Sequence, residues 1–469
     1  MTQYQLLIDG ALVDGARTID VINPATAEAF AQCPVADEAQ LDQAVDAARK
    51  AFPAWSAKSV EDRAGFINRL ADALEARHND FARLLTQEQG KPLEQAAYEI
   101  MGSVFVLRAF ANMELKPRII RENAGSKVVE VRSPLGVVAA ITPWNFPVIL
   151  LMNKLGPALL AGNTMVAKPA PTTPLTTLLL GTLCAEVLPA GVVNIICDNN
   201  DLGGVLTTHP HVAKVAFTGS TATGKKVMAA AANTIKRVTL ELGGNDAAIV
   251  LDDADPVETA RKVFQGAMIN AGQVCVAIKR AYVPEAIYDI FCEELARLAA
   301  GAVVDDGLKQ GAQIGPVQNR MQFEKLKELL DDSRDKGSVI AGGAAMDRPG
   351  YFIAPTIIRD IDEDARVVRE EQFGPVLPVL KYADVEDVIA RANDSEYGLA
   401  GTVWGTDVNR AIDVASRIQT GTVWVNQHMA IDPSLPFRGA KQSGLGGELG
   451  EEGLHEYTQA TIINAALAG

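Results

Sequence analysis

A cysteine, a glutamate and an asparagine stand out because their side chains together could carry out acyl chemistry. Cys275 ends the run Asn-Ala-Gly-Gln-Val-Cys, Glu241 lies 34 positions earlier in Leu-Glu-Leu-Gly-Gly, and Asn145 lies in Trp-Asn-Phe-Pro. A thiolate adds to a carbonyl, an amide donor stabilises the resulting oxyanion, and a carboxylate activates the water that releases an acid. These groups are the ones needed to oxidise an aldehyde through a thioester, and they say little about which aldehyde.

Two of these residues also have an ordinary structural interpretation. Most free cysteines are small buried hydrophobes, but Gly272 and Gln273 predict that Cys275 lies at a turn, where a helix N-terminus could lower the pKa of its thiol. Glu241, between two leucines, is either paired structurally or held in an apolar site that raises its carboxyl pKa toward the working range of a base. The other cysteines have no such surroundings and are assigned to packing: Cys33, Cys184, Cys197 and Cys292.

A second group of motifs could bind a nucleotide. Residues 217–226 predict a strand, a Gly-bounded turn and a helix start, where backbone N–H groups can face a phosphate. The run is close to the phosphate-loop signature, but Lys226 replaces the hydroxyl that would hold Mg²⁺. By itself it is either a tight strand-to-helix connection or an anion or dinucleotide site. Lys168 follows a predicted strand at the edge where doubly wound sheets bind ligands, although a lone surface lysine is the default interpretation.

The segment 370–376 combines acidic residues with Phe373 and a Gly-Pro turn. A solvated acidic loop is the default interpretation. However, the carboxylate of Glu371 suits ribose hydroxyls, and the Phe373 ring can pack on a flat ring.

The composition describes a globular protein with several cores. The chain has 469 residues, 48% of them apolar, and a net charge of −15. The length predicts two or three domains, and the acidic balance argues against nucleic acid or anionic membranes as partners. Five scattered cysteines and five histidines show neither a disulfide framework nor metal-ligand spacing, which fits a reducing cytoplasm. Met1 to Gln5 lead to Asp9 without a long apolar run, so no secretory signal is expected.

The order of the apolar patterns predicts an α/β fold. Residues 37–115 have helical spacing, and residues 119–134 have the pattern of a hairpin that leaves the domain body. From Gly136 onward, Val- and Ile-rich runs alternate with helical segments, which indicates two successive α/β domains with parallel sheets covered on both faces. The tail, 458–464, is typical of an edge strand that pairs with another element or subunit. The expected sheet strands are 137–141, 164–167, 192–196, 212–217, 247–250, 280–283, 376–380 and 423–426.

Together, and in this order over essentially the whole chain, these segments resemble the NAD(P)-dependent aldehyde dehydrogenase superfamily. The resemblance implies that Cys275 is the nucleophile, that Asn145 and the Cys275 backbone N–H form the oxyanion hole, and that Glu241 is the general base. Lys154 is similar to the lysine that supports the active site in this family. The implied fold is a Rossmann-type cofactor domain, an α/β catalytic domain and a small β extension through which subunits pair. The corresponding ranges are 1–118 with 137–241, then 242–436, then 119–136 with 437–469.

The resemblance also implies a cofactor site and a substrate tunnel, and no metal. Lys168 would hold the adenosine ribose of NAD, Glu371 the nicotinamide ribose, and Phe373 would brace the nicotinamide end; NADP is possible. The further cofactor-binding residues are Trp144, Gly219, Ser220 and Gly243. The tunnel residues are Phe146, Leu150, Asn153, Val274, Val276, Met429, Ile431 and Phe437. Because these are mostly apolar and carry no charge, a medium-sized aliphatic or aromatic aldehyde is the expected substrate.

Three positions depart from the family pattern. Pro171 stands three residues after Lys168, where many NAD-preferring members have a glutamate that repels a 2′-phosphate. Arg438 stands where glycine is usual and puts a cation near the expected tunnel mouth. Gly447 replaces the arginine of a usual Gly-Arg-Glu sequence.

Other functions are less well supported. A semialdehyde dehydrogenase would need a cation in the tunnel, which only Arg438 could supply. A coenzyme A-acylating enzyme needs no hydrolytic base, so Glu241 counts against it. The intact catalytic set counts against a non-catalytic nucleotide-binding protein, and Lys226 against a phosphate-loop NTPase. The expected partners are a small aldehyde and further copies of the chain, as a homodimer or homotetramer, because residues 119–136 and 458–464 look too exposed and apolar to stay unpaired.

Overall fold

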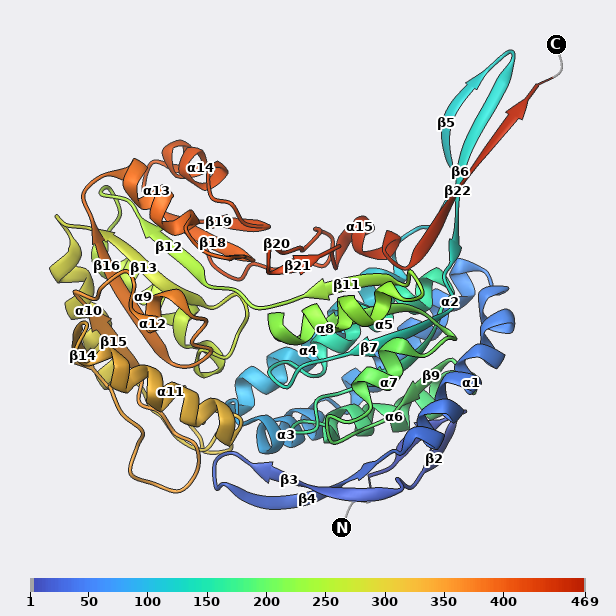
Figure 1. Ribbon diagram of the computed structural model, residues 1–469, viewed down its shortest axis with the longest axis horizontal. Coiled ribbons are helices and arrows are strands. Elements are labelled where there is room, and N and C mark those ends of the chain that lie inside the picture. Colours follow the sequence, from blue (N-terminus) through green and yellow to red (C-terminus); the bar gives the residue numbers. More distant parts are fainter. Residues whose placement is uncertain (1–3, 468–469) are drawn as a thin grey trace.

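The computed structural model describes residues 4–467, which form two large sheets with their helices and a projecting three-stranded arm (Figure 1). Residues 1–3 and 468–469 lie outside this part. The first group belongs to the region where no secretory signal is expected, and the second to the predicted range 437–469. None of the helices between residues 4 and 467 combines the length and the apolarity that a bilayer span requires.

The first sheet has eight strands, of which the five central ones run parallel. Its edges are antiparallel, formed by the N-terminal hairpin on one side and by a short C-terminal strand on the other. In spatial order the strands are β2 (Ala11–Val13), β1 (Leu6–Ile8), β9 (Val193–Ile195), β8 (Thr164–Lys168), β7 (Val137–Ile141), β10 (Val212–Thr218), β11 (Arg237–Glu241) and β21 (Gly444–Leu445). All residues of β7 and β8 are buried, which explains their continuous apolar sequence.

Eight helices belong to the part of the chain that forms this sheet. The first four confirm the helical pattern predicted over 37–115. They are α1 (Glu38–Ser56), α2 (Val60–Ala76), α3 (His78–Gln89), α4 (Leu93–Ala111), α5 (Ile149–Ala161), α6 (Leu175–Val187), α7 (Gly203–Thr208) and α8 (Thr221–Ala232). A separate hairpin of β3 (Arg17–Asn23) and β4 (Glu28–Val35), which the sequence patterns do not predict, lies along the lower edge of the molecule in Figure 1.

The second sheet has seven strands, all parallel to their neighbours except β14. Its strands in spatial order are β14 (Ser338–Ala341), β15 (Thr356–Arg359), β16 (Val376–Tyr382), β13 (Ile278–Pro284), β12 (Asp246–Val250), β18 (Ala400–Trp404) and β19 (Thr422–Val425). The accompanying helices are α9 (Pro256–Met268), the one-turn η1 (Ile269–Gly272), α10 (Tyr288–Gly301), α11 (Arg320–Ser333), α12 (Arg366–Arg369), α13 (Val385–Asn393) and α14 (Val408–Ser416). The two predicted α/β series are confirmed, whereas their division into a cofactor and a catalytic domain stays a prediction.

The arm consists of β5 (Arg118–Asn123), β6 (Ser126–Pro134) and β22 (Thr458–Ala466), and it projects well beyond the two sheets (Figure 1). Nine residue pairs join β22 to β6 in antiparallel register, from Thr458 opposite Pro134 to Ala466 opposite Ser126. The predicted hairpin and the predicted tail strand are therefore each other's partners. Helix α15 (Gly450–His455) directly precedes β22 in the chain. A separate two-stranded sheet consists of β17 (Tyr397–Gly398) and β20 (Ala440–Lys441).

Local sequence signals set several of these boundaries. Asp37 and Gln40 form a capping box at the start of α1, and the Ser59 side chain accepts a backbone N–H at the start of α2. Asp255 caps α9, which has Pro256 in its first turn. Because these side chains satisfy backbone N–H groups that have no partner within the helix, the helix starts follow directly from the sequence.

Candidate active site

Cys275 lies in a turn between η1 and β13, as the sequence predicts. The three residues Asn270, Ala271 and Gly272 all have positive φ, of 50°, 53° and 69°. A Cβ atom at Gly272 would collide with the carbonyl oxygen of Gly374, so only glycine fits there. Non-glycine residues held in this region are strained, and such strain clusters at functional sites.

The expectation that a helix N-terminus lowers the pKa of the Cys275 thiol is wrong. The helical element that precedes Cys275 in the chain, η1, ends at Gly272, three residues earlier, so the chain reaches Cys275 from the C-terminal side of that element. Burial raises the pKa of this thiol to about 12, and the positive charge of Lys279 opposes that rise only in part. The ammonium of Lys279 donates to the carbonyl oxygens of Val274 (2.9 Å) and Cys275 (2.7 Å) and so fixes the turn.

Asn145 is joined to the segment that precedes Cys275. Its side chain is 4% exposed, and its Nδ2 donates to the carbonyl oxygen of Gln273 at 2.9 Å. Its own carbonyl oxygen accepts from Nζ of Lys91 at 2.8 Å and from Nδ2 of Asn270 at 3.2 Å. The side-chain amide that is predicted to stabilise an oxyanion is therefore held next to the nucleophile turn. The backbone carbonyl of the same residue is fixed by Lys91 and by Asn270.

Glu241 ends β11 beside Thr218 of β10. It is 5% exposed, and neither of its carboxyl oxygens has a hydrogen-bond partner within residues 4–467. Burial, and then the charge of Glu448, raise the pKa of Glu241 well above its usual range. Of the two alternatives for Glu241, a structural pair or a site that raises its pKa, the structure has the second. Such a site suits a carboxyl group that must take up a proton.

Lys154 lies on α5 and is fully buried. Its Nζ donates to Oγ1 of Thr218 at 2.6 Å and to Oε1 of Glu448 at 2.5 Å. The positive charge of Lys154 also lowers the pKa of Glu241, which opposes the effect of Glu448. The structure thus links the supporting lysine to the predicted base through electrostatics.

The turn from β10 into α8 has the form expected for an anion site. Ser220 caps α8, where its Oγ accepts the N–H of Thr223 at 3.3 Å, and Ser220 remains exposed to solvent. A Cβ at Gly219 would lie 2.5 Å from the Phe217 ring, so this turn passes too close for a side chain. An exposed N-terminus on a 12-residue helix can receive the pyrophosphate of a dinucleotide.

The loop from Glu371 to Phe373 lies against the Gly243-Gly244 turn. Oε1 of Glu371 accepts the N–H of Gly244 at 2.9 Å, and a Cβ at Gly243 would lie 2.5 Å from the other carboxyl oxygen. The Phe373 ring packs edge-on against Trp144, with 5.3 Å between ring centroids. Predicted cofactor residues from three separate segments are thus brought together at one place.

Lys168 ends β8 and is buried rather than a free surface lysine. Its Nζ lies 2.6 Å from Oδ1 of Asp198, and Oδ2 of Asp198 accepts the N–H of Leu202 at 3.0 Å. Asp198 is completely buried. A carboxylate that the sequence patterns do not single out therefore neutralises the predicted ribose-binding lysine.

The predicted tunnel residues are brought together only in part. One apolar cluster contains Cys275 with Phe146, Val274, Val276, Met429 and Phe437, packed with Trp424 and Leu399. Leu150 and Asn153 lie outside this cluster, on α5, and Nδ2 of Asn153 approaches Oε2 of Glu448 at 3.5 Å. Ile431 is 47% exposed. The Arg438 side chain is 48% exposed and ion-paired with Glu452, at the surface as predicted.

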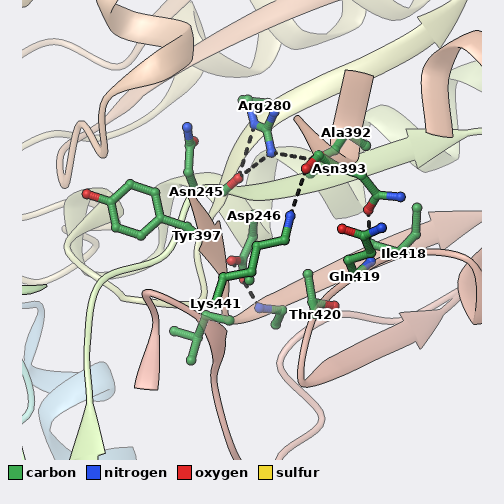
Figure 2. A pocket seen from close by; sticks show the side chains of 14 residues that line it. Asn245, Asp246, Arg280, Ala392, Asn393, Tyr397, Ile418, Gln419, Thr420 and Lys441 are labelled. Atoms are coloured by element: carbon green, nitrogen blue, oxygen red, sulfur yellow. Dashed lines mark hydrogen bonds between the residues drawn. The ribbon is translucent and has the colours of Figure 1, made fainter. Parts of the chain in front are cut away.

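A polar pocket behind the Gly243-Gly244 turn is distinct from the catalytic residues (Figure 2). Arg280 donates to the Asn245 carbonyl from Nε (3.0 Å) and Nη2 (2.8 Å), and Lys441 donates to the Asn393 carbonyl at 2.7 Å. Asp246 accepts the N–H of Ala400 at 3.1 Å, and burial raises its pKa to about 7. These contacts tie the start of β12 to neighbouring loops, and neither Cys275, Glu241 nor Asn145 lines the pocket.

Comparison with known proteins identifies the family. The model of the aldehyde dehydrogenase family matches residues 12–463. Succinate-semialdehyde dehydrogenase [NADP(+)] GabD of Escherichia coli is 39% identical over 465 residues, which cover 97% of this chain and 96% of that protein. Human retinaldehyde dehydrogenase 3 is 39% identical over 455 residues, covering 95% and 89%. The NAD⁺ complex of aldehyde dehydrogenase from Bacillus cereus superposes with a TM-score of 0.97 at 36% identity, covering 100% and 97%. The chain therefore belongs to the aldehyde dehydrogenase family.

Several residues of the site were not predicted from the sequence. Lys91, Glu99, Asp198, Lys279 and Glu448 are all buried and charged. Glu99, Asp198 and Lys279 stand in an ordinary mixture of polar and apolar residues. Lys91 lies between Gly90 and Pro92, and Glu448 follows Gly447, but these neighbours do not show that either side chain is buried and paired. Only contacts between distant segments reveal them.

Proposed function

We propose that this protein oxidises an aldehyde to its carboxylic acid through a thioester on Cys275, with water as the final acceptor of the acyl group. The observation that carries the proposal is Glu241, a buried carboxyl group without a hydrogen-bond partner, whose charge acts on the Cys275 thiol. A structural glutamate at such a position would be paired, because an unpaired buried carboxylate is costly. A general base that waits for a water has this arrangement.

NAD or NADP is the cofactor, and the residues present fit such a group. The exposed start of α8 would hold the pyrophosphate, Lys168 and Glu371 the two riboses, and Trp144 with Phe373 the nicotinamide end. Gly243 has no side chain that would collide with the Glu371 carboxyl group, which can therefore lie against this turn. When bound, the cofactor supplies the hydride acceptor.

The protein's own groups account for the other steps. The Cys275 thiol, which burial keeps protonated near neutral pH, releases its proton to solvent, and the thiolate adds to the aldehyde carbon. Asn145 with the Cys275 backbone N–H stabilises the oxyanion that forms. Glu241 later accepts a proton from the water that attacks the thioester, and the acid leaves as Cys275 regains its thiolate. Burial raises the pKa of Glu241, the charge of Glu448 adds to that rise, and the charges of Lys154 and Arg438 oppose it.

We infer NAD as the preferred cofactor. Pro171 has no carboxylate that could bind the adenosine 2′-hydroxyl. However, a carboxylate oxygen of Asp198 lies 2.6 Å from Nζ of Lys168. This pairing removes the free positive charge that a 2′-phosphate would need.

A medium-sized apolar aldehyde is the proposed substrate class. Its support is the apolar cluster around Cys275 and the position of Arg438, which is half exposed and paired with Glu452. A semialdehyde, the substrate that the GabD name gives, is the second candidate, because Arg438 is the one departure from the family pattern that adds a cation.

We also propose that the arm pairs with another copy of the chain, in a homodimer or homotetramer. Ile119 and Ile120 on β5 and Ile462 and Ile463 on β22 are each about half exposed on a sheet that projects from the body. Exposed apolar strands of this kind are normally covered. Light scattering that shows a stable, active monomer would refute this assembly.

Cys275→Ala tests the proposed reaction. The variant should lose aldehyde-dependent reduction of NAD completely, since no other cysteine has a comparable position; the other four are buried away from solvent. Activity near that of the wild type would overturn the assignment.

A further inference from the structure

Lys91 and Glu99 form a buried ion pair that plays no part in the chemistry described above. Lys91 lies in the connection between α3 and α4, and Glu99 lies on α4. Both side chains are 0% exposed, and Nζ of Lys91 lies 2.5 Å from Oε2 of Glu99. A buried ion pair adds little to stability compared with apolar packing, so its other contacts indicate what it does.

The ammonium of Lys91 has three directed contacts. Besides Glu99, it donates to the carbonyl oxygen of Asn145 at 2.8 Å, and it lies 3.6 Å from the centroid of the Phe146 ring. An ammonium has three N–H donors, so the carboxylate, the carbonyl and the ring face together account for them. Lys91 therefore holds the peptide that links the oxyanion donor to the first residue of the apolar cluster.

Glu99 holds the other end of the same segment. Its Oε1 accepts the backbone N–H groups of Val148 at 3.0 Å and Ile149 at 3.3 Å, where α5 begins. A carboxylate is favoured at a helix N-terminus because it meets free N–H groups there. Lys91 thus holds the start of the segment 145–149, and Glu99 holds its end.

We propose that Lys91 and Glu99 are positioning residues that fix the Asn145 amide for its oxyanion. The inference rests on the proposed function. With its carbonyl held by Lys91 and by Asn270, the Asn145 peptide cannot rotate, and Nδ2 is directed toward the turn that carries Cys275. Small displacements of such a donor are costly, because a shift of about 1 Å in an active site lowers rates by about 10²-fold.

The test uses a neutral double variant, Lys91→Met with Glu99→Gln. Each single change of charge leaves a buried partner unpaired, whereas the double variant leaves no charge, and glutamine keeps an oxygen for the N–H groups of α5. Glu99→Gln alone is a second variant: it leaves the Lys91 charge without its carboxylate and so costs stability, but Lys91 keeps its contact with the Asn145 carbonyl, and the loss of kcat should be smaller. Both are made in the wild type and in Asn145→Ala.

Two rates are measured. The first is kcat and KM for the aldehyde that the wild type oxidises best. The second is acylation of Cys275 by 4-nitrophenyl acetate without cofactor, which passes through an oxyanion at the same sulfur. If the wild type and Cys275→Ala react equally with this ester, the proposed function fails, and this failure is distinguishable from a failure of the inference.

The double variant should lower kcat and the acylation rate by about tenfold or more, with KM nearly unchanged. Asn145→Ala alone should cost about 10²-fold in kcat. In that background the double variant should cost less than about twofold more, because the donor it positions is gone.

A matched control distinguishes positioning from general loss of structure. Lys214 is equally buried, paired with Glu456 and placed over the Tyr457 ring. Lys214→Met with Glu456→Gln should lower the melting temperature but leave kcat within about twofold of wild type. The inference is overturned if the Lys91 and Glu99 variants retain wild-type kcat, or if their full loss persists in Asn145→Ala.

Discussion

Nζ of Lys154 lies 2.5 Å from Oε1 of Glu448, although 294 positions separate the two residues in the chain. Both side chains are buried, and each affects Glu241: the charge of Glu448 raises the pKa of that carboxyl group, and the charge of Lys154 lowers it. The ionisation of the proposed base therefore depends on its burial and, in addition, on a residue that lies far along the chain.

Glu448→Gln should lower the pKa of Glu241, because it removes the like charge that favours the protonated form. Glu241 is active as a base only when ionised, so the acidic limb of the kcat-versus-pH profile should move to lower pH. Glu451→Gln, at an exposed position three residues on, serves as the control. A limb that stays in place or moves to higher pH contradicts this electrostatic link.

The thiol of Cys275 should ionise only at high pH in the free enzyme, since burial raises its pKa to about 12. Below that pKa the thiolate fraction grows about tenfold for each pH unit. Alkylation by iodoacetamide, followed by mass spectrometry of the Cys275 peptide, should therefore accelerate without a plateau from pH 7 to about pH 10. A plateau near neutral pH would show that this thiol has a low pKa after all.

Asp198→Asn should weaken the preference for NAD. The change leaves the positive charge of Lys168 free to attract a 2′-phosphate. We expect the ratio of the dissociation constants for NADP and NAD, measured by calorimetry, to fall by about tenfold, which corresponds to about 1.4 kcal/mol. Asp201→Asn removes a nearby exposed carboxylate, paired with Arg17, and should leave the ratio unchanged. An unchanged ratio in Asp198→Asn removes this residue from cofactor selection.

Apolar aldehydes should be better substrates than acidic ones. Each methylene buried in the cluster around Cys275 gains up to about 0.8 kcal/mol until the space is filled. We expect kcat/KM for hexanal and benzaldehyde to exceed that for succinic semialdehyde. The reverse order would overturn this, and loss of the semialdehyde activity in Arg438→Ala would then show that the arginine reaches the substrate.

Local patterns in the sequence predicted much of the fold. The apolar runs at β7, β8, β10 and β12, and the helical spacing of α1 to α4, are confirmed because each records burial of its own residues. The hairpin of β3 and β4 mixes exposed, half-buried and buried residues without a continuous Val- or Ile-rich run, so it lacks such a signal. The short strand β21 has only two residues and exists because β11 offers an edge.

The residues of the site also fall into those that the sequence predicted and those that it did not. Turn residues, such as Gly272 and the Gly374-Pro375 pair, marked the segments around Cys275 and Glu371 before any contact was known. The pKa of Cys275 could not be predicted, because it depends on burial and on charged groups from other segments, Lys279 first among them. Likewise, nothing local in the sequence distinguishes Asp198 from an ordinary surface aspartate, since its role arises from Lys168 on a neighbouring strand.

The central claim is that Cys275 carries an acyl group which Glu241 releases. Glu241→Gln removes the proton acceptor but preserves size, so the acyl group should form and then remain on the sulfur. Rapid mixing of this variant with an aldehyde and NAD should give one equivalent of reduced cofactor per active site, followed by very slow turnover. Mass spectrometry of the quenched protein should then find the acyl mass on the Cys275 peptide. Turnover at the wild-type rate, or a burst without any mass added at Cys275, would contradict the account.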